Sequence, residues 1–374
     1  MIRLDRSPSR AAARPRSVGL AVGLALAGLG CSVADERVAP PSVTWSEPEK
    51  VEGLSFTAPR RPIPARALAS AAAVGANWLA VIPYGFVRPE DPIVRFDTDR
   101  QFWGESSEGV ATTIAHARAQ GLRVLLKPHL WVRGQGWPGE FLPEDEAGWD
   151  AFLSSYRDYA LTFARLADSL RVPMFSLGTE VDLVALERPS YWRDLASEIR
   201  TFYDGRLTYA ANWDKYERIE FWDALDLIGV DAYFPLVSDD SPTVDALVAA
   251  WEPWERRLAA VARRSERPIL FTEFGYRSID GAAGEHWELP DNRDAIGIPP
   301  NFDVQSSAYE AFFRAWWDRP WLAGGFLWKW HAGAPDRVPR TTDFSPQGKP
   351  AETVLADWYG GRPSLEADDD EAGG

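Results

Sequence analysis

Two glutamates, Glu180 and Glu273, each end a short apolar run in the sequence, MFSLGTE and ILFTE. A buried strand has no structural need for a carboxylate at its end, and burying an ionised carboxyl group without a partner costs free energy. Hydrolysis of a glycosidic bond uses such a pair, because one carboxyl group protonates the leaving oxygen and an ionised one meets the oxocarbenium-like centre. A separation of about 5 to 5.5 Å between the two groups would make the reaction retaining.

The runs that carry these residues belong to a larger pattern, in which short apolar segments alternate with longer amphipathic ones. Such alternation is typical of parallel strands joined by helices. Strands are expected at residues 53–56, 78–83, 123–129, 174–180, 206–212, 226–233, 269–273 and 323–328. Helices are expected at residues 65–73, 108–120, 149–169, 191–203, 244–264 and 304–318, and the fifth connection, near residues 216–222, is short. Eight such units predict the α/β class and a single-domain (β/α)8 TIM barrel over residues 50–361.

A barrel of this kind has its active site at the C-terminal ends of its strands. Glu180 and Glu273 end the fourth and seventh strands, on opposite sides of the mouth, so they can face each other across a cleft. Further polar and aromatic residues end or follow the predicted strands: Lys127, His129, Trp131, Thr179, Asn212, Trp213, Asp231, Tyr233 and Trp328.

Composition excludes several classes of protein. The 374 residues are 45% hydrophobic and 25% charged, which excludes a disordered chain. The net charge of -15 argues against a nucleic-acid partner, because phosphate backbones are repelled by a field of that sign. One cysteine and four histidines exclude a disulfide framework and leave little for a metal site, so no metal and no cofactor are expected. His286, beside Glu285 and Glu288, is interpreted as a polar loop residue.

The 18 tryptophans suggest flat apolar surfaces offered to a ligand. Five lie on or beside predicted helices and are expected to pack against the barrel: Trp149, Trp192, Trp222, Trp316 and Trp317. Five lie in strand-to-helix loops and are candidates for stacking on sugar rings: Trp103, Trp131, Trp137, Trp213 and Trp287. The loop at residues 277–302, which begins four residues after Glu273, is long and is expected to shape the cleft or close over it.

The first thirty residues have the layout of an export signal, with five arginines before the uncharged run VGLAVGLALAGLG. The run ends at Cys31, and its last residues resemble a bacterial lipoprotein processing site, although Gly28 stands where leucine is usual. We expect residues 1–30 to be a lipoprotein-type signal and Cys31 to carry a lipid that anchors the protein to a bacterial envelope membrane. Ordinary signal cleavage, which would leave a secreted or periplasmic protein with a free thiol, is the alternative. Removal of residues 1–30 leaves 35 basic and 54 acidic residues, a net charge of -19.

The segments that flank the predicted domain differ from it in composition. Residues 31–49 are rich in proline, serine and charge and are interpreted as a flexible tether. Residues 362–374, with the acidic run EADDDEAGG, are interpreted as a disordered tail, because they lack the spaced ligands of a calcium loop.

The stretches LGTEVD, GVDAYFPL, PILFTEFGY and GFLWKW resemble glycoside hydrolase family 113, in clan A, over about residues 51–360. The known activity of that family is endo-β-1,4-mannanase. The resemblance implies a retaining enzyme with Glu273 as nucleophile and Glu180 as acid/base, and a β-linked glycan, with mannan favoured, as substrate. Tyr233 matches the residue that hydrogen-bonds the nucleophile, and Trp328 matches the aromatic floor under the sugar.

Other positions follow the same resemblance, with one departure. His129 and Asn212 match places where polar residues commonly contact sugar hydroxyls, and Trp131 and Trp213 lie where aromatic rings can bind sugar. Most clan A members have asparagine before the acid/base glutamate, where it binds the 2-hydroxyl, whereas this chain has Thr179. One hydroxyl cannot reproduce the hydrogen bonds of an amide, so the exact sugar stays open.

Three alternatives to a catalytic barrel remain open at this point. The two glutamates could be structural, each paired with a lysine or arginine. The barrel could also be degenerate, which would make the protein a non-catalytic carbohydrate-binding lipoprotein of the surface. A structural or interaction protein of the envelope would bind no sugar at all.

Overall fold

The structure, a computed structural model, describes residues 41–47, 49–290, 295, 297–333 and 342–361. The predicted signal, Cys31, most of the tether and the acidic tail lie outside these residues. Among the described residues, no helix is long and apolar enough to cross a bilayer.

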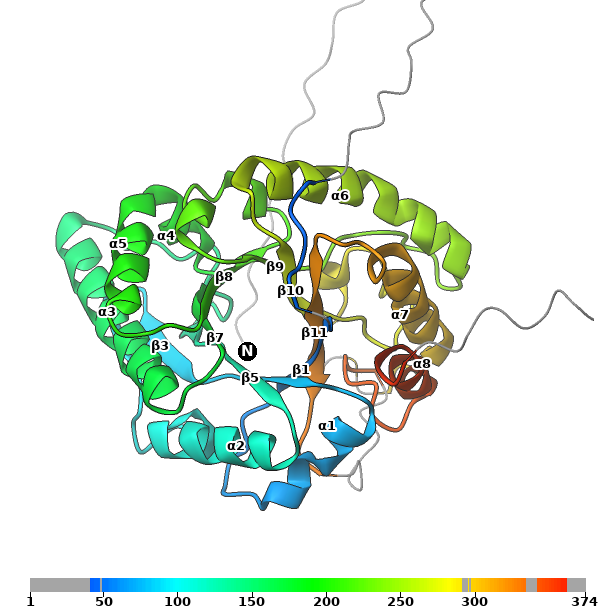
Figure 1. Cartoon of the computed structure of the whole chain (residues 1–374), viewed down its shortest axis with the longest axis horizontal. Helices are drawn as coiled ribbons and strands as arrows, with labels where there is room; N and C mark the ends of the chain where they lie inside the picture. The colour runs from blue at the N-terminus through cyan, green and yellow to red at the C-terminus, as the bar shows by residue number, and fades with distance from the viewer. Residues whose placement is uncertain (1–40, 48, 291–294, 296, 334–341, 362–374) are drawn as a thin grey trace, which may run out of the picture. The chain divides into compact units, whose positions relative to one another are not determined.

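Eight parallel strands close into a barrel with helices outside it, as Figure 1 shows in a view along the barrel. The strands pair around the ring in the order β1-β11-β10-β9-β8-β7-β5-β2. Their bounds are β1 (Val51–Phe56), β2 (Trp78–Val81), β5 (Arg123–Leu126), β7 (Met174–Thr179), β8 (Arg206–Asn212), β9 (Ile228–Asp231), β10 (Ile269–Phe274) and β11 (Leu322–Trp330). The predicted (β/α)8 barrel is therefore confirmed.

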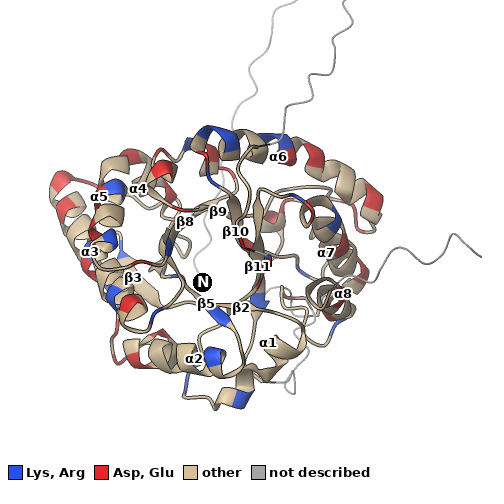
Figure 2. Cartoon of the chain, in the orientation of Figure 1, with Lys and Arg blue, Asp and Glu red and all other residues tan. Residues whose placement is uncertain are grey.

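Helices form the outer layer and carry charges of both signs, as Figure 2 shows for α6. Their bounds are α1 (Ala69–Ala73), α2 (Ser107–Ala119), α3 (Glu146–Ser169), α4 (Asp182–Glu187), α5 (Pro189–Arg200), α6 (Val244–Ser265), α7 (Phe302–Trp316) and α8 (Pro350–Tyr359). Four of them begin at a side-chain cap, because Ser106, Asp145, Thr243 and Asn301 each accept a hydrogen bond from a backbone N–H three residues on.

Alternation along the strands produces two apolar layers, one inside the barrel and one between the strands and the helices. Leu125, Met174 and Leu270 lie in the inner cluster, whereas their neighbours Leu126, Phe175 and Phe271 lie in the outer one. The five helix tryptophans predicted to pack are all buried: Trp149, Trp192, Trp222, Trp316 and Trp317.

The second and third predicted strands are too long. β2 ends at Val81 and β5 at Leu126, and the chain then enters a separate sheet with the order β4-β3-β6. Its strands are β3 (Tyr84–Arg88), β4 (Asp91–Arg95) and β6 (His129–Val132). Pro83 and Pro128 stand at the two breaks, where a residue without an N–H cannot continue a ladder. His129 therefore begins β6 and does not end a barrel strand.

The helix expected at 191–203 is present as α5 with shifted bounds, and two further helices occur. α5 begins two residues earlier than predicted and ends at Arg200, and neither α4 nor α8 was predicted. Short 3₁₀ turns occur at η1 (Ala65–Leu68), η2 (Trp103–Glu105), η3 (Tyr216–Arg218), η4 (Trp222–Ala224) and η5 (His286–Glu288).

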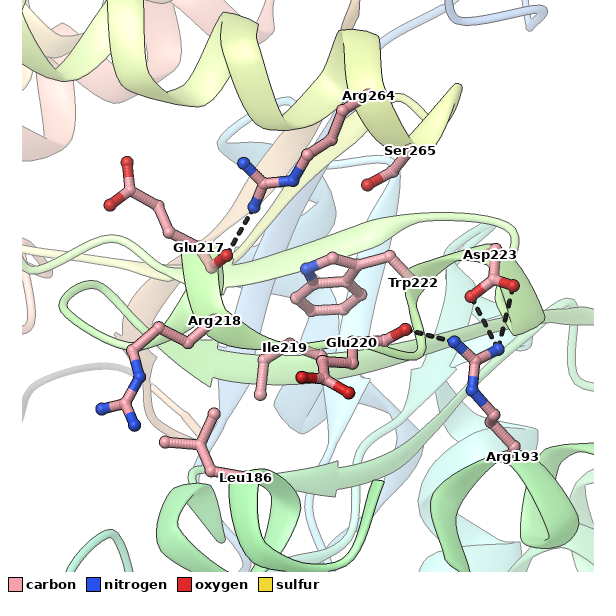
Figure 3. A pocket seen from close by; sticks show the side chains of 10 residues that line it. All are labelled: Leu186, Arg193, Glu217, Arg218, Ile219, Glu220, Trp222, Asp223, Arg264 and Ser265. Carbon is pink, nitrogen blue, oxygen red and sulfur yellow. Dashed lines mark hydrogen bonds and ion pairs between the residues drawn. The ribbon is translucent and has the colours of Figure 1, made fainter. Parts of the chain in front are cut away.

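The fifth connection is short, as predicted, and consists of η3 and η4 in place of a helix. A hollow of about 660 Å³ lies beside these turns, between α4, α5 and the end of α6 (Figure 3). Arg193 pairs with Asp223 across it, and Arg264 donates to the Glu217 carbonyl. Neither candidate catalytic glutamate lines this hollow, so the hollow is not the candidate active site.

Residues 45–47, within the predicted tether, contact the barrel. The Trp45 N–H donates to the Pro320 carbonyl at 2.8 Å, and Glu47 pairs with Arg206 at 2.8 Å. These contacts shorten the segment that can act as a flexible tether.

Close approach of β8 and β9 requires glycine at position 229. A Cβ atom added to Gly229 would lie 2.2 Å from the Tyr209 carbonyl oxygen and 2.7 Å from Thr208 Oγ1. We expect Gly229→Ala to lower the free energy of unfolding by about 1–3 kcal/mol, the usual effect of overpacking. Urea unfolding followed by circular dichroism measures this change, and an unchanged midpoint would contradict the close approach.

Candidate active site

Glu273 lies on β10 at the mouth of the barrel, where it is buried and accepts two strong hydrogen bonds. Lys127 Nζ is 2.6 Å from its Oε1 atom, and the Tyr233 hydroxyl donates to Oε2 at 2.7 Å. A cation and a hydroxyl thus hold the two carboxyl oxygens in one orientation.

Lys127 follows β5 and lies fully buried between two carboxylates. Its ammonium group also donates to Asp231 Oδ1 at 3.1 Å and to the Thr272 carbonyl at 3.2 Å. Burial alone would lower the pKa of Lys127, but the nearby charges of Asp231 and Glu273 outweigh it and raise the pKa above its usual value. Lys127 therefore stays protonated.

Asp231 ends β9 and is buried without access to solvent. It accepts a hydrogen bond from the Thr272 hydroxyl at 2.7 Å as well as the one from Lys127. Burial and the charge of Glu273 raise the pKa of Asp231 to about 7. One cation is thus shared by two carboxyl groups.

Glu180 follows β7 and forms no ion pair with any described residue. Trp137 Nε1 donates to its Oε2 atom at 2.7 Å. Burial, followed by the charges of Asp231 and Glu273, raises the pKa of Glu180 well above its usual range. At neutral pH this environment favours the protonated acid.

The backbone of Glu180 has a φ of 51°, in the left-handed region that side chains other than glycine rarely adopt. Its N–H donates to the Ala210 carbonyl of β8 at 2.7 Å, which holds this conformation in place. Residues kept in such strained conformations cluster at active sites.

An aromatic wall stands beside Glu273. His129 Nε2 is 3.4 Å from Glu273 Oε1, and the His129 ring is stacked on Trp328 with 5.9 Å between ring centres and 8° between planes. Burial and the neighbouring Lys127 lower the pKa of His129 well below its usual value, so the ring is uncharged. The structure thus brings His129, Trp328 and Tyr233 together around Glu273.

The other predicted site residues lie farther out or are already engaged. Thr179 is buried, and its hydroxyl donates to the Pro128 carbonyl at 3.0 Å. Asn212 is half-buried, and its side-chain oxygen accepts from the Trp213 N–H. Trp131 lies on β6 with 47% of its surface exposed.

The long loop after β10 reaches the site. His286 packs on Tyr233 with 5.0 Å between ring centres, and Trp287 stacks on Trp213 at 5.3 Å. Burial, followed by the charge of Arg277, lowers the pKa of His286 to about 4, so this ring is uncharged at neutral pH. Residues 291–294 and 296 of this loop lie outside the described part of the protein.

Sequence reasoning missed roles for three residues. Lys127 and Asp231 were recognised only as strand ends, although each interrupts an apolar run, which signals a buried partner. Asp182 was not considered; it is buried, accepts from the Tyr209 hydroxyl at 3.3 Å and has a pKa raised to about 8, chiefly by burial. No group of three potential metal ligands occurs among the described residues.

Glu180 after β7 and Glu273 on β10, at one mouth of a (β/α)8 barrel, are a pair of carboxyl groups of the kind that glycoside hydrolysis uses. The model of Glycoside Hydrolase Family 113 matches residues 61–349. The chain therefore belongs to this family of glycoside hydrolases, as the sequence resemblance predicted.

Solved structures agree with this assignment. A GH113 β-mannanase from Alicyclobacillus acidocaldarius, in complex with ManMIm, is 28% identical with a TM-score of 0.72, covering 83% of this chain and 97% of that one. A GH113 β-1,4-mannanase complex is 25% identical with a TM-score of 0.71, covering 84% and 100%. A β-glucuronidase from Faecalibacterium prausnitzii shares the fold alone, at 12% identity and a TM-score of 0.55, covering 83% and 49%. The comparison with curated protein sequences gave no match.

The charge cluster around Lys127 predicts a pH-dependent effect on stability. Lys127→Met leaves Asp231 and Glu273 buried without a cation, which should lower the free energy of unfolding by about 3–5 kcal/mol at pH 8. The loss should shrink at pH 5, because Asp231, whose pKa is raised to about 7, is protonated there and no longer needs the cation.

Denaturant unfolding at both pH values measures this effect. Lys215→Met, which removes the pair between Lys215 and Asp214 at the surface, is the control and should change stability by about 0–1 kcal/mol. Equal losses for Lys127→Met at pH 5 and pH 8 would contradict the interpretation.

Proposed function

We propose that the protein is a retaining β-glycoside hydrolase in which Glu273 is the nucleophile and Glu180 is the acid/base. The observation that carries the proposal is the unequal surroundings of the two glutamates. Glu273 accepts from the Lys127 ammonium at 2.6 Å, whereas Glu180 has no ion-pair partner among the described residues and has a raised pKa. Double displacement requires this division, with one carboxylate ready to attack and one acid ready to donate.

In the first step, Glu273 attacks the anomeric carbon while Glu180 protonates the glycosidic oxygen, so the glycosidic bond breaks and a glycosyl ester forms at Glu273. The Tyr233 hydroxyl, 2.7 Å from Glu273 Oε2, orients the oxygen pair. In the second step, the ionised Glu180 removes a proton from water while the water oxygen attacks the anomeric carbon. The ester bond to Glu273 breaks, which releases the sugar and restores the Glu273 carboxylate and the Glu180 acid. The configuration at the anomeric carbon is retained.

A β-1,4-linked mannan is the proposed substrate, and endo cleavage is the proposed mode. The support is the family, together with the two GH113 structures whose proteins are called mannanases. The half-buried Trp328 is stacked on His129, whose Nε2 atom lies 3.4 Å from Glu273, and is the proposed floor for the sugar ring. Because the Thr179 hydroxyl already donates to a backbone carbonyl, the Asn212 amide is the proposed contact for a sugar hydroxyl.

Chemical rescue tests the two roles separately. Glu273→Ala and Glu180→Ala should each abolish release of reducing ends from β-mannan, while Glu187→Ala, at an exposed helix end, should retain it. With an aryl β-manno-oligosaccharide and azide, Glu273→Ala should give an α-glycosyl azide and Glu180→Ala a β-glycosyl azide.

The anomeric configuration of each azide, determined by NMR, identifies the nucleophile. Full activity of Glu273→Ala would end the proposal, and exchanged azide products would reverse the two roles. A non-catalytic sugar-binding protein would bind mannan but release no reducing ends in any variant.

The pH profile tests the hydrogen bond between Trp137 and Glu180. Because Trp137 Nε1–H donates to the carboxyl group, it stabilises the ionised form of Glu180, and Trp137→Phe should raise the pKa of Glu180 further. The first step needs protonated Glu180, so the basic limb of kcat/KM should move to higher pH. Trp358→Phe, which removes a similar indole N–H donor to Glu310 at 2.8 Å in the helix layer, is the control. A basic limb that stays in place or moves to lower pH in Trp137→Phe would refute the interpretation.

A further inference from the structure

The separate sheet presents one open face beside the barrel mouth. β3 and β6 are parallel, with Tyr84 opposite His129 and Phe86 opposite Trp131. Alternate residues on β3 point the other way and are buried, since a Cβ atom on Gly85 would lie 2.9 Å from Val94. Figure 1 shows β3 beside α3, on one side of the barrel.

A continuous series of ring contacts leads along this face from the catalytic centre. His129 stacks on Trp328, Tyr84 lies 5.2 Å from His129, and Phe86 lies 6.3 Å from Tyr84, measured between ring centres. The guanidinium of Arg133 lies 5.2 Å from the centre of the Phe86 ring. His129 and Arg133 are four residues apart along extended chain, which corresponds to about 13 Å. A few linked sugar rings would span this distance.

A pocket of about 470 Å³ lies at the far end of the face. We call it the arginine pocket, because four of its lining residues are Arg88, Arg95, Arg100 and Arg133. The acidic lining residues are Asp91 and Asp99, so the pocket has an excess of positive charge in a chain whose net charge is -15.

Three of the four guanidinium groups have no acidic partner among the described residues. Arg95 pairs with Asp91 at 2.7 Å. Arg88, Arg100 and Arg133 form no ion pair and no side-chain hydrogen bond within the part of the chain that the structure describes. Gln101 Nε2 donates to the Tyr84 carbonyl at 2.7 Å and fastens the loop beside Arg100 to β3.

A neutral glycan has no charged group, so binding it would not require several arginines. A guanidinium group presents N–H donors in a planar fork that fits a carboxylate, and aromatic faces bind sugar rings. We propose that the arginine pocket is a distal subsite for a β-linked glycan that carries a carboxylate, as on a uronic acid residue, a few sugars from the cleaved bond. This inference rests on the proposed function and adds a preference for β-linked glycans that carry an acidic residue.

Binding to the inactive full-length Glu180→Gln variant tests the subsite without turnover. The probes are a β-1,4-manno-oligosaccharide with a glucuronic acid branch and the same molecule after reduction of its carboxyl group. Calorimetry at low salt should show about tenfold tighter binding of the acid form, the difference that one charge-assisted hydrogen bond provides. Adding Arg88→Gln and Arg133→Gln should bring the two affinities together, as should higher salt.

Arg256→Gln, on the outer face of α6, is the control and should keep the tenfold ratio. Equal affinity for the two probes would overturn the subsite. Equal affinity for the acid probe and for heparin, a general polyanion, would also overturn it. A third outcome is that Glu180→Gln binds the acid form more tightly but the wild-type protein hydrolyses neither probe. That outcome would overturn the proposed function and leave the subsite supported. Hydrolysis with equal binding would overturn the subsite alone.

Discussion

The site depends on one buried cation placed among several carboxyl groups. Lys127 contacts Glu273 at 2.6 Å and Asp231 at 3.1 Å, and no second lysine or arginine pairs with these groups among the described residues. One positive charge cannot offset every carboxylate in a region where charges are poorly solvated, so the more distant Glu180 is favoured as a neutral acid. Because Lys127 contacts Glu273 and not Glu180, the two glutamates favour different protonation states.

The barrel makes this sharing possible because it fixes side chains from different strands. Lys127 follows β5, Asp231 ends β9 and Glu273 belongs to β10, and parallel strands bring these ends to one face. Gly229 allows β9 to approach β8, and the hydrogen bond from Glu180 N–H to the Ala210 carbonyl holds the left-handed backbone of that residue. Rigid positions matter because the pKa of a carboxyl group depends steeply on the distance to its neighbours.

The sequence was sufficient to predict the eight barrel strands and the placement of Glu180 and Glu273 at the ends of two of them. Apolar runs mark buried strands wherever they occur, and a carboxylate at the end of such a run needs a chemical reason. The separate sheet was missed because each run continues through Pro83 or Pro128, and apolar periodicity alone does not show where a strand leaves the barrel. The partnership of Lys127 with Glu273 and the bond from Trp137 to Glu180 join residues 146 and 43 positions apart, and only the closed barrel brings them together.

A carbon-13 NMR titration of the protein labelled at the glutamate carboxyl carbon observes the division of charge most directly. We expect one carboxyl resonance to titrate well above the ordinary glutamate range and to be absent from the spectrum of Glu180→Gln. Glu52 should give a second shifted resonance, because burial raises its pKa to about 7. Since Glu52 lies outside this cluster, its resonance should be present in every variant and serves as an internal reference. The claim would be contradicted by a high-titrating resonance that survives in Glu180→Gln and disappears in Glu273→Gln.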